Sequence, residues 1–198
     1  MSIRDRRTVQ AGVSLVELIV FIVIVSIAVA GVLVALDRSA RNSADPLIIK
    51  QALAIAEALL DEVELAPFTY CDPDDPNART AAGTGSCTTT EPIVPTGGAA
   101  QGESRYSVPL FDNVADYNGF CMGTGCSPSV AGIRDITNTA IGGLNAYSAS
   151  VAVAAAALGS IAAGSGDALR ITVTVTGPAN TVVVLSGYRT RYAPNAIP

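Results

Sequence analysis

Gly12-Val13-Ser14-Leu15-Val16-Glu17-Leu18 opens the longest apolar run of this sequence. From Leu18 to Leu36 no residue carries a charge, and nineteen residues of helix would extend about 28 Å. That length is close to the hydrocarbon thickness of a bilayer, roughly 30 Å. The run therefore predicts one membrane-spanning helix over residues 13–36.

A short basic segment precedes this run. It contains Arg4, Arg6 and Arg7, with Asp5 as the one acid among them. Basic residues beside a span favour the cytoplasmic side, so we expect the residues after the span to lie across the membrane. Glu17 would then lie at the cytoplasmic end of the span. A carboxylate there is costly and usually functional.

Two simpler interpretations compete with a functional Glu17. An ordinary signal peptide has a basic start, a short apolar core and a small-residue cleavage site, which Ala28-Val29-Ala30 before Gly31 imitates. However, Glu17 separates the basic region from the core, and the apolar run continues to Leu36. A plain uncleaved anchor explains the apolar run but gives no reason for the glutamate.

The basic leader, Gly12, Glu17 and the apolar run together resemble the class III leader of type IV pilins and of type II secretion pseudopilins. The resemblance implies that a leader peptide, residues 1–12, is cleaved after Gly12. Val13 would become the N-methylated mature N-terminus, and Glu17 would serve assembly. Val13 and Ser14 depart from the family's usual Phe or Met and Thr.

Two further segments, residues 43–77 and 187–192, are similar to minor pilins of the mannose-sensitive haemagglutinin (MSHA) pilus type, in particular to their D-type members. The resemblance implies a minor pilin that enters or primes a filament, with roles in adhesion or pilus biogenesis. Its partners would be other pilin subunits, the prepilin peptidase/methyltransferase and the inner-membrane assembly machinery. It would lie in the inner membrane with a periplasmic head, and later in the filament at the cell surface.

Two other functions stay open on the sequence. One is a minor pseudopilin of type II secretion, which shares the same leader and span. The other, of a different class, is a membrane-anchored periplasmic binding module. The sequence alone does not separate these from a pilus subunit.

The segment after the span predicts a second helical stretch. Residues 37–45 are polar and predict a kink or a non-helical linker, and Asp45-Pro46 is typical of a helix start. Residues 46–66 carry apolar residues at spacings of three and four, which indicates an amphipathic helix that ends before Pro67. The stripe consists of Ile48, Ala52, Ile55, Leu59 and Val63.

Residues 67–198 predict a globular head of the α+β class, in which a small antiparallel sheet packs on that amphipathic helix. We expect strands at 105–110, 147–153, 169–176 and 181–191, of which 169–176 alternates most clearly. Residues 68–104 and 111–144 are rich in Gly, Pro and Asn and predict loops.

The four cysteines, Cys71, Cys87, Cys121 and Cys126, all follow the span. An even count beyond the membrane predicts two disulfides, for which three connectivities exist. Pairing between sequence neighbours is favoured because each bridge would fix a loop that has few packing residues. Zinc is the rival interpretation, but only the second pair approaches the spacing of a zinc site.

An acidic group at Asp72, Asp74, Asp75 and Asn77 resembles a calcium loop in composition. It lacks the glycine and the distal glutamate of an EF-hand, and two prolines interrupt it. Asp and Asn before Pro are common in turns, so we interpret 72–77 as an acidic turn and predict no metal and no cofactor. Whether this loop binds calcium stays open.

The composition argues against catalysis and against nucleic-acid binding. The chain has no histidine, a single lysine at position 50, and no nucleophile-elbow, P-loop or dinucleotide motif. From Pro67 onward there are six arginines, no lysine and nine acids. Phosphate neutralisation needs clustered basic residues, so we expect neither an enzyme nor a nucleic-acid partner.

Overall fold

The structure is a computed structural model that describes residues 14–93, 98, 101–127 and 130–197, without the side chains of residues 38–45. Contacts divide the chain into two compact units, Met1–Asp45 and Pro46–Pro198. Each unit is described by itself. Gly12 and Val13 lie outside the described residues.

Helix α1, Leu15–Leu65, belongs to both units. It begins where the Ser14 carbonyl accepts a hydrogen bond from the Leu18 N–H at 3.1 Å. Ser26 is the polar residue inside the apolar run, and its hydroxyl donates to the Ile22 carbonyl at 2.7 Å. The hydroxyl therefore adds no unpaired polar atom to the apolar surface.

The stretch expected to separate two helices is itself helical. Residues 37–45 are part of α1, and Pro46 lies inside the helix, so the predicted non-helical linker and the helix start at Pro46 are wrong. Proline costs one backbone hydrogen bond in a helix, yet α1 continues on both sides of Pro46. A bend at this place stays a prediction.

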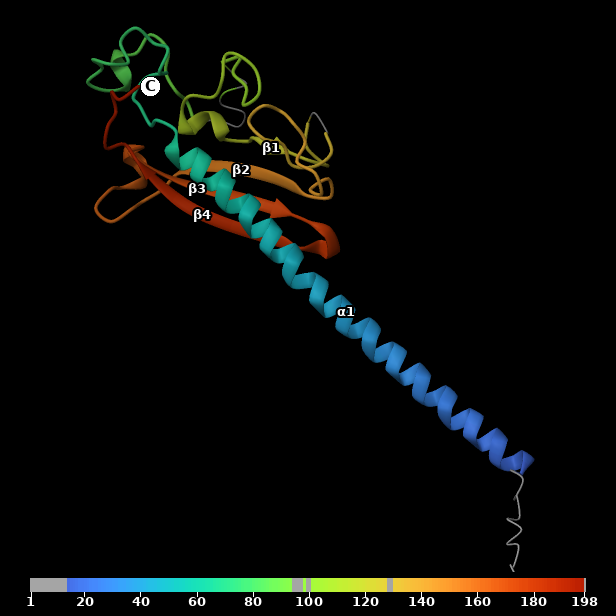
Figure 1. The fold of residues 1–198 in the computed structure, drawn as a ribbon. Helices are drawn as coiled ribbons and strands as arrows, with labels where there is room; N and C mark the ends of the chain where they lie inside the picture. The colour runs from blue at the N-terminus through green and yellow to red at the C-terminus, as the bar shows by residue number, and fades with distance from the viewer. Residues whose placement is uncertain (1–13, 94–97, 99–100, 128–129, 198) are drawn as a thin grey trace, which may run out of the picture. The chain divides into compact units, whose positions relative to one another are not determined.

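The second unit contains a four-stranded sheet (Figure 1). Its strands are β1 (Cys121–Met122), β2 (Ser148–Ala155), β3 (Ala168–Thr176) and β4 (Val182–Thr190), antiparallel and in the order β1-β2-β3-β4. The strands predicted at 147–153, 169–176 and 181–191 are confirmed within a few residues. The α+β class is confirmed as well.

The strand predicted at 105–110 is wrong. This segment forms a loop, in which the Ser104 N–H donates to the Pro109 carbonyl and the Phe111 N–H donates to the Ser104 carbonyl. The backbone thus bonds to itself across the turn rather than to a neighbouring strand. Pro109 lacks the N–H that a sheet position needs, which weakens any competing strand.

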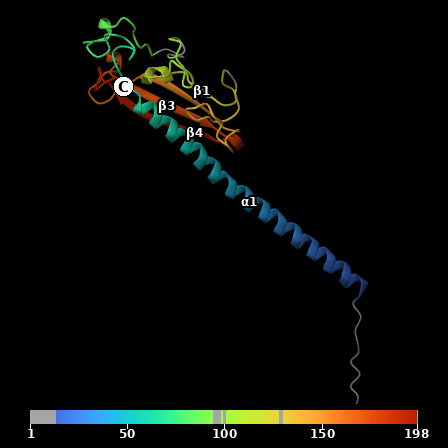
Figure 2. The same ribbon diagram turned by 45° about the horizontal axis from the view of Figure 1, so that its top comes forward.

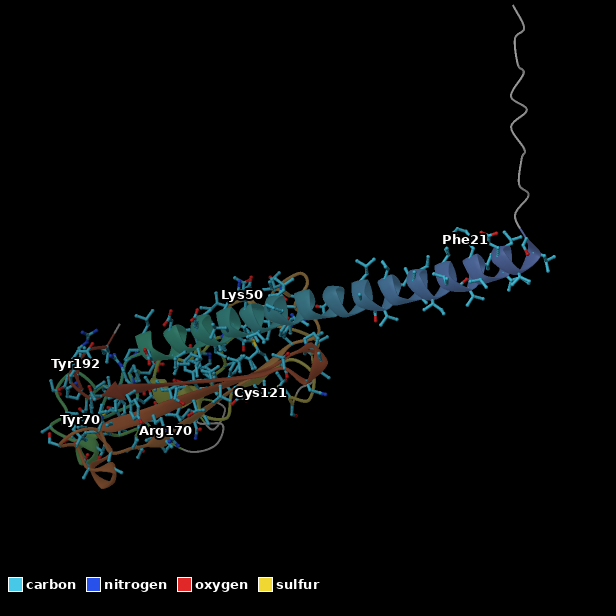
Figure 3. The ribbon with its side chains drawn as sticks, turned by 90° about the horizontal axis from the view of Figure 1, so that it is seen from below. Phe21, Lys50, Tyr70, Cys121, Arg170 and Tyr192 are labelled. Atoms are coloured by element: carbon cyan, nitrogen blue, oxygen red, sulfur yellow. A yellow bond between two sulfur atoms is a disulfide. The ribbon has the colours of Figure 1, made fainter. Side chains whose placement is uncertain are left out.

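The core lies between the sheet and residues 46–65 of α1. Side chains alternate along β3, with Leu169, Ile171, Val173 and Val175 buried and the residues between them more exposed. The predicted stripe of α1 packs against this face, with Ile48 at its half-buried edge. Figure 3 shows Lys50 on the outer side of the helix and Arg170 on the opposite face of the sheet.

Gly187 lets the helix approach β4 closely. A Cβ atom at this position would collide with the Glu64 carboxylate and come within 3.3 Å of Leu60. Glycine is otherwise unfavourable inside a strand. It fits at position 187 because the Glu64 and Leu60 side chains of α1 occupy the space that any larger residue there would need.

An ion pair ties the loops to the helix. Arg105 is only 7% exposed, and its Nε donates to the Glu62 Oε1 at 2.7 Å. Its Nη2 donates to the Glu62 Oε2 at the same distance, and the Tyr117 hydroxyl donates to the Glu62 Oε1 at 3.0 Å. Burial alone would lower the pKa of Arg105, but the hydrogen bonds and charge of Glu62 raise it above its usual range.

The structure joins Cys71 to Cys87 and Cys121 to Cys126, the neighbour pairing that the sequence favoured. The first bridge lies in the loops that follow α1. These loops and the C-terminus gather at the end of α1 in both ribbon views (Figures 1 and 2). There the Tyr70 N–H donates to the Pro194 carbonyl at 3.2 Å.

Candidate functional site: the apolar helix and an acidic cluster

The first half of α1 is an exposed apolar surface. Residues Leu15–Asp37 are long and apolar enough to cross a membrane, and none of the apolar window within them is buried. Phe21, labelled in Figure 3, is 62% exposed. Such a surface needs lipid or another apolar partner. A signal sequence has the same features, so the helix by itself indicates a possible anchor or signal.

Glu17 is the one acid in the first turn of α1, and its side chain is exposed. A carboxylate in this turn interacts favourably with the positive end of the helix dipole. Processing after Gly12 and methylation of Val13 concern residues outside the described part of the chain, so both stay predictions. The assembly role of Glu17 also stays a prediction.

A second candidate site is a cluster of carboxyl groups in the loops of the second unit, here called the acidic cluster. Its members come from loops that are separate in sequence. They are Asp72, Asp74, Glu91, Glu103, Asp112 and Asp116.

Two local structures bring these loops together. The Cys71–Cys87 bridge and a hydrogen bond from the Asp72 N–H to the Thr89 carbonyl (3.2 Å) place the 72–75 turn beside the segment leading to Glu91. The 3-10 helix η2, Val114–Tyr117, positions the other two aspartates. The Asp116 Oδ2 accepts from the N–H groups of Asp112 (3.0 Å) and Asn113 (2.7 Å).

The carboxyl oxygens of the cluster lie close to one another. One oxygen each from Glu91, Asp112 and Asp116 lie within 4.8 Å of one another, and the same holds for Asp72, Asp74 and Asp112. Asp112 belongs to both groups. Gln101 links them, since its amide Nε2 donates to Asp72 at 2.9 Å and to Glu91 at 3.4 Å.

Several oxygens of the cluster are buried without a hydrogen-bond donor among the described residues. They are the Glu91 Oε1, Gln101 Oε1, Glu103 Oε2, Asp112 Oδ1 and Asp116 Oδ1. A buried oxygen of this kind is costly, and native structures contain few of them.

The pKa values reflect this crowding. Burial, followed by the charge of Asp116, raises the pKa of Glu91 to about 9. Burial, followed by a side-chain interaction with Asp116, raises the pKa of Glu103 to about 8. Burial, followed by the charge of Asp116, raises the pKa of Asp112 to about 7. All three groups therefore resist ionisation unless positive charge is supplied.

The predicted acidic turn at 72–77 has two parts. Asp75 serves the turn itself, because its carboxylate accepts hydrogen bonds from the N–H groups of Thr89 and Asn77. The Thr89 hydrogen bond is the main reason that the pKa of Asp75 is lowered. Asp72 also serves the turn, since its Oδ1 accepts from the Asp74 N–H at 2.7 Å, but Asp72 and Asp74 belong to the acidic cluster as well.

Sequence reasoning missed Glu91, Glu103, Asp112 and Asp116, because they are 4 to 12 residues apart and follow no motif spacing. The one feature of the sequence that could have indicated this cluster is the excess of acidic residues in the segment. Residues 91–116 hold four acids and one basic residue, Arg105, and that arginine pairs with Glu62.

An apolar pocket of about 400 Å³ lies between α1 and the loop around residues 133–144. Ile55, Leu59, Met122 and Leu144 contribute to its wall. Its charged residues include Glu62 and Arg105, which already pair with each other. This cavity is where the binding-module alternative would place a small apolar ligand.

Comparison of the chain with protein-family models, curated proteins and solved structures found no match. The likeness to pilins therefore rests on the leader and span motifs of the sequence. The α+β fold rests on the structure.

Proposed function

We propose that this chain is a subunit of a type IV pilus-like filament, a minor pilin of the MSHA type. The observation that carries the proposal is the exposed apolar helix that begins at Leu15, close after the predicted cleavage site, with Glu17 in its first turn and no other charge as far as Leu36. In the membrane this surface contacts lipid. In a filament, the same surface of neighbouring subunits would cover it.

The energetics of Glu17 support this role. A charged acid in a span costs about 2.5–3.5 kcal/mol on insertion scales. Contact at about 4 Å with the free α-amine of a neighbouring subunit returns about 4 kcal/mol at an effective dielectric constant of 20. These terms roughly offset each other, and only one axial stagger of the two subunits allows the contact. Glu17 would therefore select the register of assembly.

Replacing Glu17 with Gln tests the role in assembly. The variant keeps the shape of the side chain and removes its charge, so it should insert in the membrane at least as well as wild type. We expect normal amounts of cleaved, membrane-embedded protein and at least a tenfold loss from sheared filaments. Glu57→Gln, the same change at an exposed site in the second half of α1, is the matched control. Equal incorporation of both variants would contradict the proposal.

N-terminal analysis of the membrane-embedded protein tests the processing step. The proposal requires cleavage between Gly12 and Val13, with a methyl group on the new α-amine. A mature chain that begins at Gly31 would instead establish an ordinary signal peptide, and an uncleaved chain would establish a plain anchor. Loss of secretion without loss of filaments in a deletion strain would favour the pseudopilin alternative.

A further inference from the structure

We propose that the acidic cluster binds one calcium ion, with Glu91, Asp112 and Asp116 as ligands and Glu103 beside them. The site lies entirely in the second unit, Pro46–Pro198, and does not depend on the proposed filament function. It differs from the metal-free acidic turn that the sequence suggested, because all of its ligands lie outside residues 72–77.

The first argument is unbalanced charge. The described part of the second unit forms two ion pairs, Arg105 with Glu62 and Arg191 with Asp167, and neither includes a member of the acidic cluster. Carboxylates this close together repel one another strongly in a partly buried site. They must either take up protons or share a cation.

The second argument is independent of acidic composition, since it concerns buried oxygens that have no partner. Asp116 is 1% exposed and Glu103 is 6% exposed. Among the described residues, the Asp116 Oδ1 and the Glu103 Oε2 have no hydrogen-bond donor. Both lie in the cluster, because Asp116 interacts with the side chains of Glu91 and Glu103.

The neighbouring groups fit the same ion. Among the described residues, the Oε1 of Gln101 has no hydrogen-bond donor, and a buried amide oxygen is a ligand type that calcium accepts. The Asp116 carboxylate is held in place by the two N–H groups on its other oxygen, so one oxygen stays directed at the cluster. A cation would satisfy these oxygens together, whereas each added proton satisfies only one or two of them.

The chemistry of the donors selects calcium among the common metal ions. The chain has no histidine, and its four cysteines are in disulfides, so the donors are oxygens and the ion must be hard. Calcium takes 6–8 oxygens at about 2.3–2.6 Å, so its ligands lie up to about 5 Å apart. One carboxyl oxygen each from Glu91, Asp112 and Asp116 lie within 4.8 Å of one another, which is close enough for one calcium ion to contact all three. Magnesium requires a stricter octahedron, which irregular loops form less readily.

Calcium titration of the full chain in non-ionic detergent tests the site. After treatment with EDTA and its removal, calcium chloride should bind at one ion per chain by calorimetry. Extracellular calcium modules have dissociation constants of about 10⁻⁴–10⁻³ M, so 5 mM calcium should stabilise the fold by about 1–2 kcal/mol and raise Tm by about 2–9 °C. No binding heat and an unchanged Tm would overturn the proposal. An equal shift with 5 mM magnesium alone would overturn the choice of calcium.

Glu91→Gln separates binding from simple structural support. Removing one carboxylate relieves repulsion, so this variant should have a higher Tm than wild type in EDTA and should bind calcium at least tenfold more weakly. If Glu91 had only a structural role, Glu91→Gln would have a lower Tm than wild type both in EDTA and in calcium. Asp61→Asn, a loss of one exposed acid on α1, is the matched control and should keep the full calcium shift.

Glu103→Gln provides an independent variant if Glu91→Gln does not fold, because it leaves the hydrogen bonds of Asp116 in place. It should also lose most of the calcium response. If folded Glu91→Gln keeps the full calcium shift and the wild-type affinity, the assigned ligands are wrong. If folded Glu103→Gln keeps both, the negative charge beside the ligands does not hold the ion. Either result overturns the proposal.

Discussion

The two halves of α1 have the same secondary structure and opposite surfaces. Residues 18–36 carry no charge on any side, and the large apolar side chains among them are exposed. Residues 46–65 are apolar along one stripe, which the sheet covers, while Lys50 and Glu57 lie exposed on the other sides. Both halves are helical although the first is rich in Val and Ile and the second in Ala, Leu and Glu, so helix formation does not distinguish them. The arrangement of the apolar residues does: it lets the sheet cover one half and leaves the other exposed among the described residues.

A matched pair of leucines should show this difference most strongly. Leu59 is 3% exposed and lies in the core, whereas Leu33 is 61% exposed. Leu59→Ala removes buried methyl groups and should cost about 3–4 kcal/mol, which lowers the Tm of the head by about 10 °C. Leu33→Ala should change it by less than about 1 °C. Thermal unfolding of the sheet, followed by circular dichroism in detergent, measures both.

The outcome that would contradict the comparison is a similar loss of stability in both leucine variants. In that case the first half of α1 would contribute to the head, and its exposed surface would have a partner within the same chain.

The Arg105–Glu62 pair should be the next strongest contact between the loops and the second half of α1. Arg105→Ala leaves Glu62 partly buried without its partner, so we expect a loss of about 3 kcal/mol. The Asp167–Arg191 pair is the control, because Asp167 is 46% exposed and Asp167→Asn should cost less than about 1 kcal/mol. Equal losses would show that burial does not decide the strength of these pairs.

Each disulfide should contribute about as much to the free energy of unfolding as the Arg105–Glu62 pair, or less. The Cys71–Cys87 bridge closes 16 residues and should contribute about 3 kcal/mol, while Cys121–Cys126 closes 5 and should contribute about 2 kcal/mol. Paired Cys→Ser variants, compared by thermal unfolding, measure the two values. The wild-type chain should show no titratable thiol in denaturant without reductant. Two or more thiols would contradict the pairing.

The sequence predicted those parts of the fold that repeat with a short period. The 3.6-residue period of Ile55, Leu59 and Val63 and the two-residue period of Ile171, Val173 and Val175 both follow from which face is buried. The long apolar helix was predictable from the length of its apolar run and the absence of charge alone. The α1 stripe and the alternating strand residues each pack against one continuous surface, so a local pattern suffices to predict them.

The acidic cluster could not be predicted in the same way. Its ligands come from separate loops, and their distances depend on the Cys71–Cys87 bridge and on the cap of η2. The strand expected at 105–110 failed for a related reason, since the backbone there bonds across its own turn. Contacts set by loop closure leave no periodic trace in the sequence.

Pro46 marks the boundary between the two halves, and replacing it should have the smallest effect on the stability of the head. Pro46 lies inside α1 and is also the first residue of the second unit. Proline cannot donate to the carbonyl four residues earlier, and its ring crowds that carbonyl. Pro46→Ala restores the donor and removes the crowding, which favours the helix locally by up to about 3 kcal/mol. The buried stripe begins beyond this position, at Ile48, so the Tm of the head should rise by less than about 2 °C.

Hydrogen exchange at the Pro46 boundary should respond more strongly than Tm, because the exchange of the amides at 40–48 in Pro46→Ala should slow at least tenfold. An unchanged exchange rate would mean that Pro46 does not weaken the helix between the units, and the bend that the sequence predicts there would lose its physical basis.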